Sequence, residues 1–118
     1  MTHDNNQPNS IKLAKQCANL LVNKKAQQLT VLDLRGLASY TDCLVIASAT
    51  SIRHVTTLGQ HLTQQLTQDG IRPLSTEGET GSSWMLLDYG DVVVHLFDEE
   101  TRLHYDLEGL WADAPHIA

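Results

Sequence analysis

The stretch DCLVIASA, from Asp42 to Ala49, is apolar on both of the faces that an extended chain presents. Side chains alternate between the two faces of a strand, so a run of this kind has no face to offer to water. Such runs are typical of a central strand in a mixed or parallel sheet that helices cover on both sides. The sequence therefore predicts an α/β fold built around this strand.

The spacing of apolar residues before and after this strand predicts a helix, a strand and a second helix. Apolar residues at helical spacing predict an N-terminal helix, which Ser10 is positioned to cap. Residues 29–34, LTVLDL, are rich in branched side chains and predict a strand. After the central strand, Thr50 or Ser51 is expected to cap a helix that ends at Gly70.

A hairpin is the clearest signal in the C-terminal half. Residues 84–87 and 91–97 predict two strands around Gly90, which is expected to take the left-handed position of a three-residue loop. The pairs that this loop predicts are Leu86 with Val92 and Trp84 with Val94.

The segments that flank the hairpin predict an edge strand, a loop and a last helix. Residues 71–74 are at best an edge strand, because Pro73 cannot donate a hydrogen bond, and residues 75–83 are typical of a loop. Asp98 can cap the last helix. The side chains expected to form the buried face of that helix are Leu103, Leu107, Leu110 and Trp111. The elements together predict a mixed five-stranded sheet flanked by helices.

Length and charge limit the classes of partner. The chain has 118 residues and a formal net charge of −6, so one domain is expected and direct nucleic-acid binding is disfavoured relative to a basic protein partner. No run approaches the roughly 18 apolar residues that cross a membrane. The polar residues 1–9 lack a signal-peptide pattern and are expected to form a flexible tail. The sequence therefore predicts a cytoplasmic protein.

Neither the cysteines nor the histidines have the spacing of metal ligands. Cys17 and Cys43 each lie in an apolar pattern and are expected to be reduced core thiols. His54 and His61 are seven residues apart, which is about 10 Å along a helix and too far to grip one ion. We expect no metal and no cofactor.

No group of residues has the pattern of an active site, and we expect no catalytic residue. Ser51 and His54 come nearest to a nucleophile with its base, but a capping hydroxyl and a first-turn histidine explain them. No glycine-rich loop precedes a helix that could hold phosphates. Four aspartates lie at predicted strand ends, where a divalent ion could bind, although two of them are expected to be turn formers. The four are Asp33, Asp42, Asp88 and Asp91, of which Asp88 and Asp91 belong to the hairpin turn.

An acid-rich segment, residues 98–108, directly follows a hairpin that is apolar on both faces. The two predicted faces are Trp84, Leu86, Val92, Val94 and Leu96 on one side and Met85, Leu87, Val93 and Phe97 on the other. We expect a domain of this size to leave part of the hairpin uncovered. An apolar patch rimmed by carboxylates suits a basic protein, because aromatic groups anchor the partner and the acids orient it.

Three blocks of the sequence resemble the ribosomal silencing factor family, also called Iojap or RsfS. The blocks are TDCLVIASATSIRHV (residues 41–55), EGETGSSWMLLDYGDVVVHLF (77–97) and RLHYDLEGLW (102–111). Their order and spacing are more specific than any single motif. The resemblance extends over residues 10–114, which we therefore expect to form one silencing-factor domain.

The resemblance implies a fold, a function and a set of partner-binding residues. The implied fold is like that of nucleotidyltransferases but lacks the catalytic motif, so the implied function is not enzymatic. Family members bind the fourteenth ribosomal protein of the large subunit, block joining of the small subunit and repress translation under nutrient limitation. The implied partner-binding residues are Trp84, Asp88, Asp91, His95 and Phe97.

Two other functions stay open at this point. The strand-end acids could belong to a small enzyme that acts on a nucleotide with a divalent ion. The apolar hairpin could instead build a structural homodimer, which is also compatible with ribosome binding.

Overall fold

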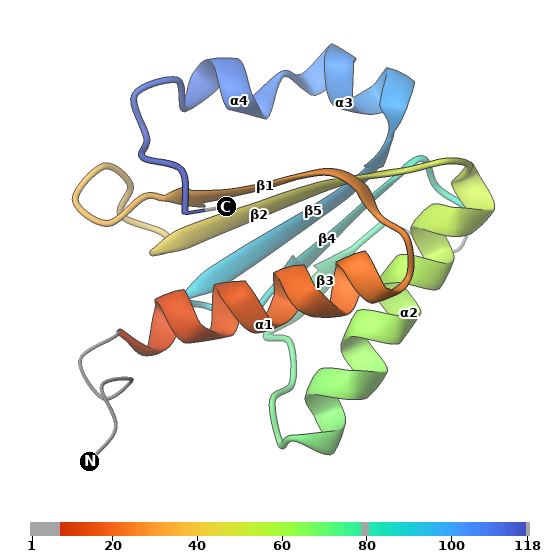
Figure 1. Ribbon diagram of the computed structural model, residues 1–118, viewed down its shortest axis with the longest axis horizontal. Helices are drawn as coiled ribbons and strands as arrows, with labels where there is room; N and C mark the ends of the chain where they lie inside the picture. Colours follow the sequence, from red (N-terminus) through yellow and green to blue (C-terminus); the bar gives the residue numbers. More distant parts are fainter. Residues whose placement is uncertain (1–7, 79–80, 118) are drawn as a thin grey trace.

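The computed structural model describes residues 8–78 and 81–117, which fold around a single five-stranded sheet (Figure 1). The elements in chain order are α1 (Asn9–Asn23), β1 (Gln27–Asp33), β2 (Cys43–Ala49), α2 (Ile52–Gln68), β3 (Ser75–Glu77), β4 (Trp84–Asp88), β5 (Val92–Asp98), α3 (Glu99–Tyr105) and α4 (Leu107–Leu110). The strand order in the sheet is β1-β2-β5-β4-β3. The expected tail, residues 1–9, falls mostly on residues 1–7, which lie outside the described residues, while Asn9 belongs to α1.

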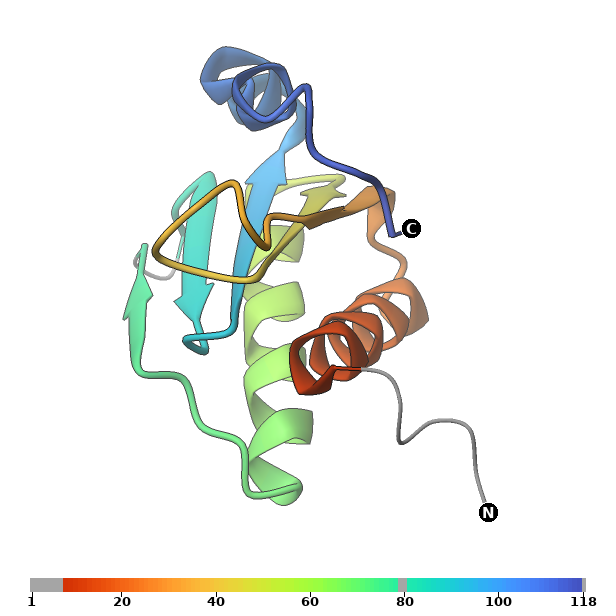
Figure 2. The ribbon, with the colours of Figure 1, turned by 90° about the vertical axis from the view of Figure 1, so that its left-hand side faces the viewer.

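β2 is the central strand that its sequence predicts. All seven of its residues are buried, and it pairs antiparallel with β1 and parallel with β5. Helices cover both faces of the sheet, α1 and α2 on one side and α3 with α4 on the other (Figures 1 and 2). The predicted α/β fold with a mixed, helix-flanked sheet is therefore confirmed.

Two of the three predicted helix caps are confirmed, and the third is wrong. Ser51 accepts a hydrogen bond from the His54 backbone at 3.0 Å, and Asp98 accepts one from the Thr101 backbone at 2.9 Å. Ser10 is not the cap of α1, because the helix begins one residue earlier, after Pro8, and the buried Ser10 hydroxyl has no hydrogen-bond partner. Pro8 fixes its own backbone angle without a side-chain bond, so this helix begins without a polar cap.

The hairpin has a different register from the predicted one. Trp84 pairs with Phe97 and Leu86 pairs with His95, three positions further along β5 than expected. Gly90 is left-handed, with φ 84°, but β4 continues to Asp88 and the loop closes through a hydrogen bond from Tyr89 N to Val92 O.

A shift by an odd number of residues exchanges the faces of one strand. The predicted division of the two faces was therefore wrong for β5. Val92, Val94 and Leu96 share the α1–α2 core with Met85 and Leu87, while Val93 and Phe97 lie on the opposite face with Trp84 and Leu86.

The edge strand lies at residues 75–77, in the segment predicted to be a loop, and not at residues 71–74. Its three residues are all exposed, so no apolar pattern marks them. Pro73 has no N–H to donate to a ladder. The backbone of Leu74 makes the first hydrogen bond to β4, from its N–H to Asp88 O, and the paired residues begin at Ser75.

The predicted last helix is broken into α3 and α4 at Asp106, which has a left-handed φ of 47°. The break rotates the second half, so the predicted apolar stripe does not form. Leu103 and Leu110 are 77% and 71% exposed, and only Leu107 and Trp111 pack against the sheet. We call α3 and α4, residues 99–110, the C-terminal arm.

After the arm, the chain returns to the sheet and covers the free edge of β1. Asp33 N donates to Pro115 O, and Ile117 N donates to Val31 O at 2.7 Å. These bonds occupy backbone groups that an edge strand otherwise leaves open to other chains. Within the described residues, no helix combines the length and apolar character that a membrane crossing requires.

Cys17 and Cys43 are free and buried, as predicted. Burial raises the pKa of Cys17 to about 12 and the pKa of Cys43 to about 11, because a thiolate is poorly solvated in the core. Both thiols are therefore protonated and unreactive at neutral pH.

Gly78, in the connection between β3 and β4, lies too close to the backbone of Trp84 for a larger residue. It has a positive φ of 94°, and a Cβ added there would overlap the carbonyl oxygen of Trp84. Gly36 has a similar φ of 82° but open space around it. We expect Gly36→Ala to lower the free energy of unfolding by about 1–2 kcal/mol through backbone strain alone, and Gly78→Ala to cost at least about 1 kcal/mol more. Urea unfolding of both variants measures this, and equal costs would contradict the close approach at Gly78.

Candidate partner-docking site

An aromatic cluster lies on the face of β4 and β5 that is turned away from α1 and α2. Trp84 pairs with Phe97 across the two strands, and His95 is two residues before Phe97, so the three side chains share one face. Tyr105 from the C-terminal arm joins them. The four rings, Trp84, His95, Phe97 and Tyr105, are called the aromatic cluster below.

The rings of this cluster stack on one another in a closed circuit. The ring-centre distances are 6.3 Å from Trp84 to His95, 5.7 Å from His95 to Phe97, 5.5 Å from Phe97 to Tyr105 and 6.1 Å from Tyr105 to Trp84. Phe97 is 1% exposed and forms the floor, whereas Tyr105 is 53% exposed and Trp84 and His95 are half-buried. Three aromatic groups of the cluster are therefore available to a partner, and Phe97 supports them from below.

His95 is held in a defined state within the cluster. Trp84 Nε1 donates a hydrogen bond to His95 Nδ1 at 3.2 Å, which requires Nδ1 to be an acceptor. Burial lowers the pKa of His95 from 6.5 to about 4, because the charged ring would lose its hydration. The imidazole is therefore neutral at physiological pH and contributes an uncharged, stacked surface.

The two hairpin aspartates lie at the far end of the same strands. Trp84 and Asp88 are the first and last residues of β4, so about 13 Å of strand separates them. Asp88 Oδ1 accepts a hydrogen bond from Gly90 N at 2.8 Å, as expected of a turn former, and Asp91 is exposed. Of the five residues that the resemblance implies, the structure brings Trp84, His95 and Phe97 together and leaves Asp88 and Asp91 apart from them.

The C-terminal arm and the residues next to it are rich in carboxylates. Residues 98–113 contain six acidic residues and one arginine. Glu99 and Glu100 are exposed in the first turn of α3, where the helix dipole favours them. The helix that carries Tyr105 therefore also carries exposed negative charge, on the side where Glu99 and Glu100 lie near Gln28 of β1.

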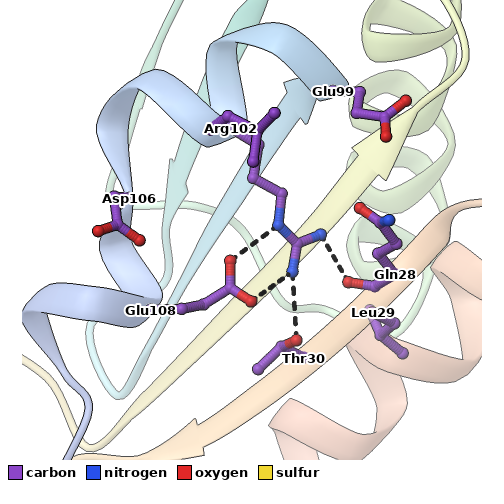
Figure 3. Close-up of a pocket in the computed structure, with 8 residues that line it drawn as sticks. Gln28, Leu29, Thr30, Glu99, Arg102, Asp106 and Glu108 are labelled. Carbon is purple, nitrogen blue, oxygen red and sulfur yellow. Dashed lines mark hydrogen bonds and ion pairs between the residues drawn. The ribbon is translucent and has the colours of Figure 1, made fainter.

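Arg102 is the residue of this region that the sequence reasoning missed. It is 6% exposed, and its five N–H groups all donate hydrogen bonds. Figure 3 shows the bonds to Glu108, Thr30 and Gln28. The acceptors are both carboxylate oxygens of Glu108, the backbone oxygen of Gln28, the hydroxyl of Ser48 and the hydroxyl of Thr30. A lone arginine among six acids was the available signal, because an arginine in such a segment either pairs locally or is buried.

The pocket beside Arg102 has a volume of about 390 Å³ and includes Leu103, Asp106 and Glu108 in its walls (Figure 3). Arg102 and two of the carboxylates in its wall are already engaged with neighbouring groups, while Glu99, which also lines the pocket, is exposed. Glu108 takes two bonds from Arg102, which lowers the pKa of that carboxyl, and Asp106 accepts from Gly109 N. No free cation of the pocket wall is left to bind an anionic ligand.

The alternative catalytic groups are not assembled. Ser51 receives its bond from the backbone of His54, while the His54 ring accepts from Thr50 N and donates from Nε2 to Lys24 O, so no base faces the hydroxyl. Asp33 is paired with Arg35 at 2.7 Å, which lowers the pKa of that carboxyl. Among residues 8–78 and 81–117, no three His, Cys, Asp or Glu side chains gather as a metal site would require.

Comparison with known proteins agrees with the blocks quoted above. Residues 7–118 match the family described as "Ribosomal silencing factor during starvation". A ribosomal silencing factor from Halalkalibacterium halodurans is 34% identical over 106 residues, which cover 90% of this chain and 91% of that protein. A mouse protein named Mitochondrial assembly of ribosomal large subunit protein 1 is 34% identical over 78% of this chain and 42% of its own length. A crystal structure of a Chromobacterium violaceum protein is 32% identical, has a TM-score of 0.81 and covers 86% of each chain.

The state of His95 predicts a pH dependence of stability. Between pH 6.5 and about 4 the unfolded chain binds a proton that the folded protein does not, so the free energy of unfolding falls as the pH falls through this window. The slope is at most about 1.4 kcal/mol per pH unit. His95→Gln keeps an acceptor for Trp84 and should flatten the dependence, whereas substitution of the exposed His104 should not. Urea unfolding at several pH values measures it, and equal profiles for wild type and His95→Gln would contradict the buried neutral ring.

Proposed function

The chain belongs to the ribosomal silencing factor family, and from this membership we propose that it binds the large ribosomal subunit and represses translation. The specific partner we propose is the fourteenth ribosomal protein of that subunit. Occupation of this site would block association with the small subunit, and nutrient limitation would be the condition under which this happens. The protein would act in the compartment of its ribosomes, which for a bacterial chain is the cytoplasm.

The aromatic cluster is the observation that carries this proposal. Trp84 and Tyr105 offer large apolar surfaces that are stacked and therefore pre-organised, which lowers the entropy lost on binding. Glu99 and Glu100 lie exposed on the same arm as Tyr105. Aromatic anchors together with carboxylates on the same arm suit a basic protein as the partner. The printed name of the mouse relative supports the large subunit as the place of binding.

Repression would follow from exclusion and needs no chemical step. A protein that binds one subunit on its joining surface competes with the other subunit. The fraction of joined subunits then depends on the affinities and concentrations of the two competitors. We accordingly propose that the protein is not an enzyme. The proposal is supported by the dispersed positions of Asp33 and Asp88 and by the occupied ring of His54.

Cosedimentation tests the partner. The protein should move with isolated large subunits in a sucrose gradient and should reduce the 70S peak when small subunits are added. Binding should weaken as salt rises, because the acidic arm contributes screened attraction. The double variant Glu99→Gln/Glu100→Gln should bind more weakly and lose part of this salt dependence. Protein that stays at the top of the gradient at low and moderate salt, with subunits in excess, would refute the proposal.

Trp84→Ala tests the anchor. Loss of the indole should weaken binding to large subunits by about 30-fold or more, which corresponds to about 2 kcal/mol. The half-buried ring should cost less unfolding free energy than the roughly 3–5 kcal/mol of a core aromatic residue. Val22→Ala is the matched control, because Val22 is an exposed apolar residue of α1 on the opposite side of the sheet. Unchanged affinity in a folded Trp84→Ala protein would remove this residue from the interface.

The non-enzymatic proposal has its own measurement. Nucleoside triphosphates with Mg²⁺ or Mn²⁺ should show neither saturable binding in calorimetry nor turnover. Turnover that Asp33→Ala or Asp88→Ala abolishes would favour the nucleotide-acting enzyme. Stable dimers that bind no ribosomal subunit would favour the structural homodimer.

A further inference from the structure

We infer that Arg102 is the positioning residue of the docking site: it holds the C-terminal arm on the sheet so that Tyr105 completes the aromatic cluster. The inference rests on the proposed function for its binding consequences, and on the contacts of Arg102 for its structural part. Arg102 itself is buried and does not reach a partner.

Arg102 connects the arm to two strands at once. Its Nη1 donates to the Gln28 carbonyl of β1 and to Ser48 Oγ of β2 at 2.8 Å, and its Nη2 donates to Thr30 Oγ1 of β1 at 3.2 Å. The remaining two donors bind Glu108, which lies in α4. One guanidinium therefore joins α3, α4, β1 and β2, and a planar fork with five donors is the side chain that can do so.

Two unusual backbone positions converge on this guanidinium. Gln28 has a left-handed φ of 49° where the register of β1 shifts between Gln27 and Thr30, and the bulge points its carbonyl at Arg102 (Figure 3). Asp106 has a left-handed φ of 47°, and the turn that it makes brings Glu108 back over Arg102. Such conformations are unfavourable for residues other than glycine and persist where the surroundings stabilise them. Here Gln28 supplies an acceptor to Arg102 itself, and the turn at Asp106 brings the Glu108 carboxylate to the same side chain.

The arm has little else to hold it in place. Arg102 is the only buried residue of α3, and α4 has none. Leu103 and Leu110, the apolar residues that a packed helix would bury, face the solvent. Leu107 and Trp111 supply a partial apolar contact, and the five bonds of Arg102 supply the defined geometry.

Arg102 affects the docking site through the position of Tyr105. It follows Arg102 by three residues, so both lie on nearly the same side of α3. Arg102 fixes the rotation of this helix about its axis, and the rotation decides whether the Tyr105 ring stacks on Trp84 and Phe97. A looser arm would leave Trp84 without one of its two stacking neighbours.

A spectroscopic experiment tests the structural part. The chain has two tryptophans, so in a Trp111→Phe background the fluorescence comes from Trp84 alone. Arg102→Lys keeps the charge but lacks the fork, and it should shift the Trp84 emission to longer wavelength and weaken the near-ultraviolet circular dichroism of the cluster. The far-ultraviolet spectrum of the sheet and of α1 and α2 should be retained. Ser48→Ala removes one acceptor of Arg102 and should produce a smaller change in the same direction. This variant provides the test if Arg102→Lys does not fold.

A double-mutant cycle tests the coupling to binding. Arg102→Lys and Tyr105→Ala should each weaken binding to isolated large ribosomal subunits by about tenfold, and the double variant should be no weaker than Tyr105→Ala alone. Val22→Ala serves as the control that changes neither signal. An unchanged Trp84 emission in folded Arg102→Lys, or losses of affinity that add in the double variant, would overturn the inference. If the wild type itself fails to bind subunits, the proposed function fails, while the fluorescence result still decides whether Arg102 positions the arm.

Discussion

The burial of β2 on both faces is the constraint on which the rest of the structure depends. All seven of its residues are buried, so neither face can be left to water and two separate layers of helix are required. α1 and α2 provide one layer before and after β2 in the chain. The arm and the C-terminal segment, which follow β5, supply part of the second layer, and the connection between β1 and β2 adds Leu34 and Ala38. A short and acidic segment therefore serves as part of the covering of the central strand.

Local patterns in the sequence predicted the features that local interactions determine, which are the main strands and two of the helix caps. Alternation and apolar runs located β1, β2, β4 and β5, and side-chain oxygen atoms located the caps at Ser51 and Asp98. The hairpin register was not predicted, because it depends on where the loop closes, and a last pair of Asp88 with Val93 moves every partner on β5 by three positions. β3 was not predicted either, since three exposed residues that pair only through their backbone leave no apolar pattern.

Only part of the aromatic cluster could be predicted from the sequence, because one of its four rings is placed by long-range contacts. Trp84, His95 and Phe97 belong to one hairpin, so a local pattern can place them near one another. Tyr105 reaches them only because the arm folds back over the sheet, and that depends on the long-range bonds of Arg102 to β1 and β2. An error of register also hid the cluster, because the predicted faces had separated Trp84 from Phe97.

The position of Arg102 also explains why part of the sheet stays uncovered. Its bonds draw the arm toward β1 and β2, where the buried guanidinium finds its acceptors, and the arm contacts the β4 side through the ring of Tyr105, which stacks on Trp84. Trp84 and Leu86, the β4 residues of this face, therefore remain half-buried. A fully apolar stripe on the arm would have buried more surface at this end of the molecule. The polar attachment instead covers part of the central strand and leaves the β4 side half-open, so the same segment is both a structural layer and the source of Tyr105 in the docking site.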